Sequence, residues 1–285
     1  EFRGGTNMTF YGVDADRKAQ KLADAIFAAS RRTFKQLGLP DYSETSVELI
    51  GAESQFGANA QISRCRELVL KIAAKHPEAA GIGILLKEAV GLGLATPPGL
   101  SGFAGARPSP SPVVRLFSFA LPKGTAQIEV EIDGVTHQVP DGPGQSFSVQ
   151  KLPRPTAPAA PTDASVPVPL IKLAWGRSGD KGDKANIGII ARRPEYLPYI
   201  YAALTEQAVA DGFAHFLPAQ AAGKTESYVD RYLMPGSHAI NFLIHDVLGG
   251  GGMASIRNDA QGKGYGQILL ALSIPVSAEI AEHIK

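Results

Sequence analysis

Apolar residues recur every three or four positions over residues 14–37 and predict a long amphipathic helix. Leu22, Ile26 and Phe34 fall on one face of this helix, while basic residues are interleaved on the other. Gly38 follows the last periodic position, as is typical of a helix end. The sequence therefore predicts a helix that buries one side against a core.

Shorter signals fill the rest of the first half. Strands are expected at 46–50, 67–73, 113–121 and 127–133, with a return strand at 135–139, and a helix is expected at 76–91. Asp133-Gly134 is the clearest hairpin turn in the chain. We expect a mixed α/β fold for this N-terminal portion.

Residues 140–169 carry eight of the 21 prolines and show little periodicity. This composition is typical of an extended linker between domains. We therefore predict a first domain at 1–150, a linker at 151–166 and a second domain at 167–285.

The second domain alternates strand and helix signals. Strands are expected at 169–175, 186–191 and 228–233, and a helix at 194–213. Periodicity does not decide the apolar segment 238–248, but a glycine run follows it and favours a helix; residues 267–274 fit a final strand or the tail of a helix. This order predicts an α+β domain with helices layered on one face of a small sheet.

A polar stretch at 176–186 lies between two apolar strand segments and is expected to form a compact loop. Asp180 and Asp183 are candidate catalytic residues: either could act as a general base, or both could offer oxygen ligands to a divalent cation. Alternatively, the glycine amides and lysines of the loop could hold a phosphate or carboxylate. The candidate ligand-binding residues are Arg177, Ser178, Lys181 and Asn186. The competing interpretation is a tight polar turn with no ligand.

A run of four glycines forms the second candidate site. It consists of Gly249, Gly250, Gly251 and Gly252, and Arg257 and Lys263 follow it. Exposed amides of such a run can bind an anion, and an arginine can add a bidentate contact. A flexible surface loop is the alternative.

His238, Asn241 and His245 would share one face if residues 238–248 are helical. His245 is then a candidate general base. A histidine that is satisfied within the core or at its boundary is the alternative interpretation.

Composition narrows the class of function. The chain carries 28 Lys+Arg against 27 Asp+Glu, and a net charge of +1 does not provide the positive potential that binds a nucleic-acid backbone. No apolar run approaches the length of a membrane span. The lone Cys65 excludes an intrachain disulfide and an iron–sulfur cluster, which needs about four cysteines. We expect a cytoplasmic globular protein.

The motifs of the second half resemble those of the acyclic terpene utilisation family AtuA. The matching segments are 178–183, 186–188, 235–242, 248–252 and 257–263. The likeness of residues 1–140 to the end of the family's larger N-terminal domain is looser and rests on 3–4, 12–17 and 46–51.

The resemblance implies a ferredoxin-like fold for 167–285, and it implies that 1–150 is the C-terminal part of a larger domain. Because the chain also starts at Glu1 without an initiator methionine, we expect it to be a piece of a longer protein. The family is associated with bacterial breakdown of citronellol and geraniol, beside acyl-CoA carboxylases, dehydrogenases and hydratases, and implies no settled reaction.

Residues and resemblance together favour a protein that binds or acts on a CoA-linked intermediate, or on a terpenoid or branched-chain acid. Its chemistry would be that of a lyase or hydratase, with no redox cofactor and with a divalent cation as an open option. We expect self-association and contacts with other catabolic enzymes. The alternative is a non-catalytic scaffold or oligomerisation module of the pathway.

Overall fold

The computed structural model describes residues 1–62, 64–102, 107–142, 144, 153–221 and 223–284. The chain forms two compact units. The first joins Glu1–Arg115 with Ala157–Lys285, and the second is Leu116–Thr156. The first unit contains two hydrophobic cores. We call the elements that surround the first core along the chain the N-terminal lobe and those that surround the second the C-terminal lobe.

The N-terminal lobe is built on an antiparallel sheet in the order β2-β3-β1-β4, with β5 also paired to β1. Its strands are β1 (Phe2–Tyr11), β2 (Glu44–Ile50), β3 (Glu67–His76), β4 (Leu100–Ser101) and β5 (Ser111–Pro112). The structure confirms the predicted strands at 46–50 and 67–73. No strand was predicted over β1, because polar and glycine residues fill its middle. A Cβ on Gly5 would lie 2.2 Å from the Ile72 carbonyl oxygen, so the close pairing with β3 requires glycine there.

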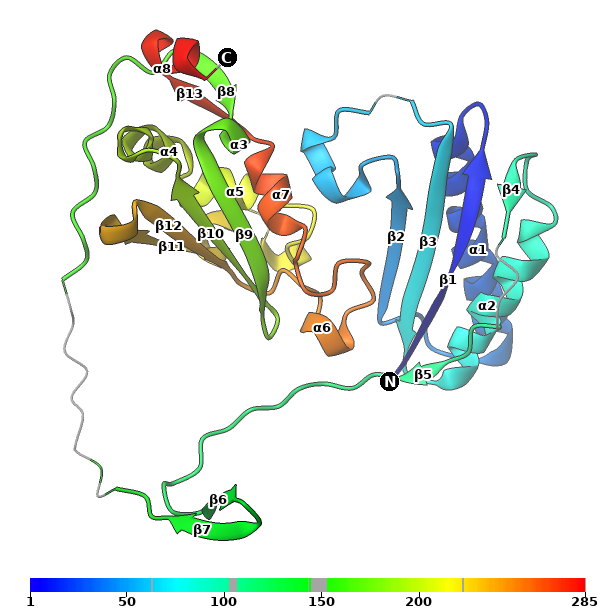
Figure 1. Ribbon diagram of the computed structural model, residues 1–285. Coiled ribbons are helices and arrows are strands. Elements are labelled where there is room, and N and C mark those ends of the chain that lie inside the picture. Colours follow the sequence, from blue (N-terminus) through cyan, green and yellow to red (C-terminus); the bar gives the residue numbers. More distant parts are fainter. Residues whose placement is uncertain (63, 103–106, 143, 145–152, 222, 285) are drawn as a thin grey trace. The chain divides into compact units, whose positions relative to one another are not determined.

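Two helices cover one face of this sheet, α1 (Ala15–Leu37) and α2 (Ala79–Gly93) (Figure 1). Both predicted helices are confirmed. Phe10, Leu70 and Ile82 are fully buried between the helices and the sheet. The apolar stripe read from the sequence of α1 is therefore the stripe that this lobe buries.

The C-terminal lobe has a second antiparallel sheet in the order β11-β12-β10-β9. Its strands are β9 (Ala174–Lys181), β10 (Lys184–Ala191), β11 (Val229–Met234) and β12 (Ala239–Ile244). Beside it, β8 (Val166–Pro169) pairs with β13 (Ser273–Val276). Its helices are α3 (Leu170–Leu173), α4 (Leu197–Ala203), α5 (Glu206–Gly212), α6 (Gly251–Ala254), α7 (Tyr265–Leu270) and α8 (Ala278–His283). Its 3₁₀ turns are η2 (Pro194–Tyr196), η3 (Ala219–Ala221), η4 (Thr225–Tyr228) and η5 (Pro235–Ser237). A further 3₁₀ turn, η1 (Ser54–Asn59), follows β2 in the first half of the chain. The antiparallel sheets with helices layered on them confirm the predicted mixed α+β class.

The helix predicted for 238–248 is wrong, since this segment forms strand β12. Ile240, Phe242 and Ile244 are fully buried, while Asn241 and Leu243 between them are half-buried, which is the period of a strand. Periodicity gave no decision because the segment is almost uniformly apolar. Pairing with β10 and β11 on its two sides makes it a strand.

Two further predictions need correction in the same lobe. Residues 176–186 are not a loop, because β9 continues to Lys181, turns at Gly182 and pairs with β10 from Lys184 onward. The strand predicted at 169–175 contains the helical turn α3 before β9 begins. Residues 267–274 hold both elements considered, the end of α7 and the start of β13.

The single helix predicted at 194–213 is interrupted. Leu204 and Thr205 leave the helical conformation, with ψ values of 67° and 163°. The Thr205 hydroxyl then accepts a hydrogen bond from the Ala208 amide at 3.1 Å and begins α5. The chain therefore forms two short helices, α4 and α5, in place of one.

In the described part of the second unit, β6 (Ile128–Ile132) and β7 (Val135–Val139) form an antiparallel hairpin. This confirms the turn predicted at Asp133-Gly134. The strand predicted at 113–121 is wrong, because no strand among the described residues pairs with this largely exposed stretch. The linker predicted at 151–166 begins outside the described residues; 153–165 has no regular element. The three-part domain division remains a prediction.

Thr205→Ala removes the N-cap of α5, and we expect it to lower the free energy of unfolding by about 1 kcal/mol. Urea unfolding followed by circular dichroism measures the change. Thr205→Ser keeps the hydroxyl and is the matched control. Equal stability of the alanine and serine variants would contradict this role of Thr205.

Candidate functional site

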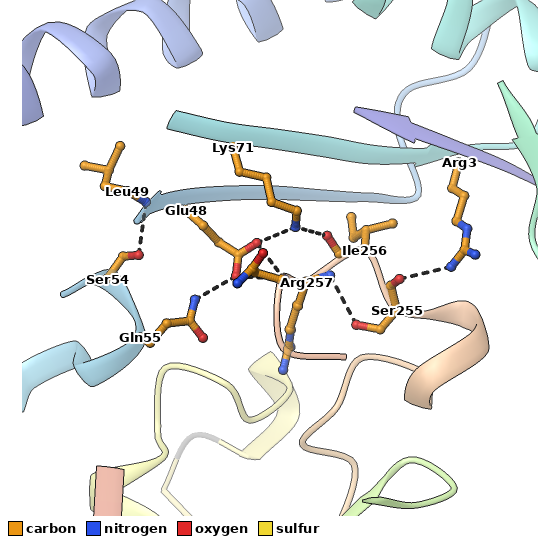
Figure 2. A network of polar contacts seen from close by, with 10 residues as sticks. Arg3, Glu48, Leu49, Ser54, Gln55, Lys71, Ser255, Ile256 and Arg257 are labelled. Atoms are coloured by element: carbon orange, nitrogen blue, oxygen red, sulfur yellow. Dashed lines mark hydrogen bonds and ion pairs between the residues drawn. The ribbon is translucent and has the colours of Figure 1, made fainter. Parts of the chain in front are cut away.

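A buried carboxylate on β2 joins the two lobes of the first unit (Figure 2). The Glu48 side chain is only 6% exposed, and its Oε2 lies 2.5 Å from the Lys71 Nζ. The Asn258 amide donates to both carboxylate oxygens, at 3.0 and 2.8 Å, and the Gln55 Nε2 donates at 2.7 Å. Lys71 also donates to the Ile256 carbonyl oxygen at 2.6 Å.

Residues 255–258 form the loop that contacts Glu48 and Lys71, and two more hydrogen bonds fix its conformation and position. Arg3 donates to the Ser255 carbonyl oxygen at 3.1 Å, and the Ser255 hydroxyl accepts from the Arg257 amide at 3.2 Å (Figure 2). Residues 255–258 of the C-terminal lobe are thus fixed to β1, β2 and β3 of the N-terminal lobe. We call this set of contacts the Glu48 clamp.

A cleft of about 1080 Å³ lies in this unit and takes its walls from both lobes. The N-terminal lobe contributes 43–48, Ser54, Gln55 and Lys75, beside Glu1 and Arg115. The C-terminal lobe contributes Asp183, His215, Phe216, Pro218, Ala219, Gln220, Asp246, Gly249, Gly250 and Arg257. Most of these side chains are polar or charged, and Phe216 with its neighbours adds an apolar wall.

Lys75 places a buried ammonium group beside this cleft. Only 4% of its side chain is exposed, and its Nζ lies 2.6 Å from the Glu44 Oε2. The same Nζ donates to the Gly249 carbonyl oxygen at 3.3 Å. The sequence analysis missed both residues. Lys75 follows the strand predicted at 67–73 and lies between Ala74 and His76, so no pattern in the sequence marks it, and its partner on β2 is visible only in the fold.

The glycine run adopts a backbone that other residues rarely take. Gly249, Gly250 and Gly251 have φ values of 67°, 97° and 77°. The Asp183 Oδ1 accepts from the Gly250 amide at 2.7 Å, and a Cβ on Gly251 would lie 2.5 Å from the Gly182 carbonyl oxygen. Positive φ and close contact with the turn before β10 therefore explain why glycine is required here.

Arg257 lines the cleft, but both of its terminal nitrogens already donate to carbonyl oxygens. One donates to Val247 and the other to Phe216, the latter at 3.0 Å. The guanidinium also lies over the Phe216 ring, 5.4 Å from its centroid. Arg257 therefore holds two segments of the cleft wall, in addition to any contact with a ligand.

The cleft brings together four residues that the sequence analysis singled out, Asp183, Gly249, Gly250 and Arg257. The others lie elsewhere. Asp180 pairs with Lys263 at 3.5 Å, and the Ser178 hydroxyl accepts from the Gly266 amide at 2.7 Å. Gly251 is buried within α6, and Gly252 is exposed.

Arg177 and Lys181 are exposed on the other face of β9, and Asn186 on β10 donates to the Asn241 side chain at 2.8 Å. The ligand-binding roles expected of all these residues remain predictions.

His245 does not share a helix face with His238 and Asn241, because the segment is a strand. Its Nε2 lies 2.8 Å from the Asp230 Oδ2, and this hydrogen bond holds the pKa of Asp230 below its usual range. Neither residue lines the cleft. The general-base role expected of His245 thus remains a prediction outside this site.

No group of three or more histidine, cysteine, aspartate or glutamate side chains in the described part of the chain is arranged to hold a metal ion. Asp180 and Asp183 each have a partner in the chain, a lysine and a backbone amide. Likewise, none of the helices in the described ranges is both long and apolar enough for a membrane crossing.

His215 connects the cleft wall to the N-terminal lobe. Its Nε2 lies 2.9 Å from the Gln55 carbonyl oxygen, and its ring contacts that of Phe216 at a tilt of 40°, with centroids 4.0 Å apart. Burial, with a smaller contribution from the nearby Arg257, holds the pKa of His215 below its ordinary value. The imidazole is therefore favoured in its neutral form.

Comparison with known families gives two matches. Residues 1–132 match the model described as acyclic terpene utilisation family protein AtuA, and residues 168–275 match the AtuA ferredoxin-like domain. The second match confirms the ferredoxin-like fold expected of the C-terminal lobe. Neither a protein of curated function nor a solved structure matches the chain.

Lys71→Met leaves the Glu48 charge buried without its cation, and we expect it to lower the free energy of unfolding by about 3 kcal/mol. The double variant Glu48→Gln/Lys71→Met should be more stable than Lys71→Met alone, because glutamine still accepts from the Asn258 amide and carries no charge. Urea unfolding measures both. Lys87→Met on the exposed side of α2 is the control, and equal losses in the two lysine variants would contradict the clamp.

We also expect the free energy of unfolding to decrease as the pH falls, because of His215. Since its folded pKa is depressed, the unfolded chain takes up the proton first, so stability is full above about pH 6.5 and decreases below it. We expect His215→Gln to flatten this decrease in urea unfolding series. The exposed His137→Gln is the control. An unchanged pH slope in His215→Gln would disprove the assignment.

Proposed function

Because the chain belongs to the acyclic terpene utilisation family AtuA, we propose that its cleft binds a carboxylic acid or CoA thioester of acyclic terpene breakdown, such as that of citronellol. We further propose that it adds water to, or removes water from, the bound acyl group. The proposed location is the cytoplasm, where CoA thioesters are handled. The observation that carries the proposal is the ion pair between the buried Lys75 and the partly exposed Glu44 at the cleft.

The dimensions and lining of the cleft support a ligand with both polar and apolar parts. Its volume of about 1080 Å³ is at the upper end of the range for small-molecule sites. Phe216, Pro218 and Ala219 offer an apolar wall for a branched acyl chain. Lys75 and Arg115 offer positive charge for a carboxylate or a thioester carbonyl oxygen.

The Lys75–Glu44 pair can serve as an acid–base device. An ammonium group in a poorly hydrated position strongly stabilises negative charge that develops on a carbonyl oxygen. The Glu44 carboxylate is about one-third exposed and can take a proton from water. Lysine and glutamate thus occupy complementary roles at one edge of the cleft.

The proposed step needs no redox cofactor. In hydration of an α,β-unsaturated thioester, Glu44 takes a proton from water as the oxygen bonds to the β-carbon. Electron density moves to the carbonyl oxygen, where the Lys75 ammonium stabilises it. The Glu44 carboxyl then gives this proton to the α-carbon and becomes a carboxylate again, so that one molecule of water has been added across the double bond.

Isothermal titration of the full chain with CoA, a branched enoyl-CoA and the corresponding free acid tests binding. We expect Lys75→Met to weaken binding by about tenfold, a loss of about 1.4 kcal/mol, and Lys75→Arg to retain part of it. Lys87→Met lies outside the cleft and is the matched control. Glu44→Gln should still bind but lose incorporation of labelled oxygen from water, detected by mass spectrometry.

Binding without labelled product would overturn the hydration step and leave the binding site. No binding of any of the three ligands would overturn the proposal as a whole.

A non-catalytic assembly role is the second candidate, and one observation favours it. One face of the β6–β7 hairpin carries Ile128, Val130, Ile132, Val135 and Val139, each between 43% and 58% exposed. An isolated hairpin is at best marginally stable in water, so an apolar face of this kind is typical of a docking element. Absence of both ligand binding and turnover would favour this candidate.

A further inference from the structure

The second sheet has one covered face and one open face. Residues 185, 187 and 189 of β10 point toward the helices and are buried. The alternating residues of all four strands form the opposite face, and several of their large side chains are about half exposed. None of the residues named below on this face lines the cleft, so the inference is independent of the proposed function.

An apolar row crosses this open face from one edge to the other. Trp175 on β9 pairs with Ile190, Ile190 with Ala239, and Ala239 with Met234 on β11. Trp175, Ile190 and Met234 are 53%, 45% and 51% exposed. Tyr232 in the next row is 45% exposed. Ala239, which lies between Ile190 and Met234, is buried, so the exposed apolar surface of this row lies toward its two ends. Exposed apolar side chains that gather on one face are typical of an interface, whereas scattered ones are not.

Charged side chains on the same face lie at both of its edges, and Lys184 on the inner strand β10 adds an exposed positive charge beside Lys181. Arg177 is exposed on β9, with Lys181 following on the same face, and Asp230 is exposed on β11. β9 and β11 are the outer strands of this sheet. The register places Arg177 in the row of Tyr232, one row from Asp230, so the opposite charges lie at opposite edges and at nearly the same height along the strands.

We propose that this open face is a homodimer interface in which two copies stack face to face about a two-fold axis parallel to the strands. Such an axis keeps each row at its own height and lays β9 of one copy over β11 of the other. Arg177 of each copy then meets Asp230 and Tyr232 of the second copy, and the apolar rows lie on each other. A face with the same charge at both edges would be repelled by its own copy; this one is self-complementary.

The size of the face indicates how tight the dimer is. Four strands about 4.8 Å apart, with strands of up to eight residues at about 3.4 Å each, give a face of about 500 Å² per copy. The total of about 1,000 Å² is near the lower limit for a specific interface. We therefore expect a reversible dimer whose population rises with protein concentration.

Sedimentation velocity over a concentration series, combined with quenching of tryptophan fluorescence, tests the interface. Trp175 is the only tryptophan of the chain, so its emission reports on this face alone. We expect the dimer fraction and the protection of Trp175 from acrylamide to rise together. Dimers that leave Trp175 equally accessible would overturn the proposal, as would a monomer at every concentration, which would assign the face to another partner.

Charge reversal identifies the paired edges. Arg177→Glu and Asp230→Arg each place like charges together twice in their own dimers, and we expect each variant alone to shift toward monomer. An equimolar mixture of the two should restore the dimer, because both contacts of the heterodimer then join opposite charges. Arg32→Glu, exposed on α1 of the other lobe, is the matched control and should leave the wild-type dimer unchanged.

Failure of the mixture to restore the dimer would overturn the two-fold arrangement. Circular dichroism of each single variant verifies that it is folded, which matters because Asp230 also bonds His245.

Discussion

The charge of Glu48 is the constraint on which the first unit depends. Removing a carboxylate from water costs several kcal/mol unless a cation and hydrogen-bond donors meet it. Here the cation comes from β3 and an amide donor comes from the loop at 255–258, so the requirement is met only when both lobes contribute. The hydrophobic cores stabilise each lobe separately, while the Glu48 clamp fixes how one wall of the cleft is built.

The glycine run is the next part of that wall. The Asp183 carboxylate accepts from the Gly250 amide, and the Lys75 ammonium donates to the Gly249 carbonyl oxygen, so a negative and a positive side chain bind the two polar groups of one peptide bond. Arg257 donates hydrogen bonds to the carbonyl oxygens of Val247 and Phe216. Charged groups that a sequence would assign to a ligand thus also satisfy the chain's own backbone.

The cleft is also lined by Glu1, Arg115, Asp246 and the Lys75–Glu44 pair. The Lys75–Glu44 pair is the part of this charge on which the proposed function depends. Its ammonium is almost fully buried and its carboxylate is partly exposed, so the two partners differ in hydration. The proposed hydration uses this difference, because it places the carboxylate toward water and the ammonium toward the carbonyl oxygen. The open face of the second sheet uses other residues, which allows binding in the cleft and assembly through the sheet to be separated by mutation.

The sequence by itself determined the elements whose signals are local. The 3.6-residue stripe of α1, the Asp-Gly turn of the β6–β7 hairpin and the alternation in β3 each depend on residues that are near neighbours along the chain. The motifs of the second half were likewise enough to indicate a ferredoxin-like domain.

Only the tertiary structure decided the features that depend on distant partners. An almost uniformly apolar segment became β12 because strands flank it on both sides, and β1 formed without a pattern of its own because β3 pairs with it. Lys75 became part of the candidate site through Glu44, thirty-one positions earlier in the chain, and through Gly249, 174 positions later. Pattern and turn chemistry act over a few residues, whereas burial of a charge depends on which distant groups the fold brings within hydrogen-bonding distance.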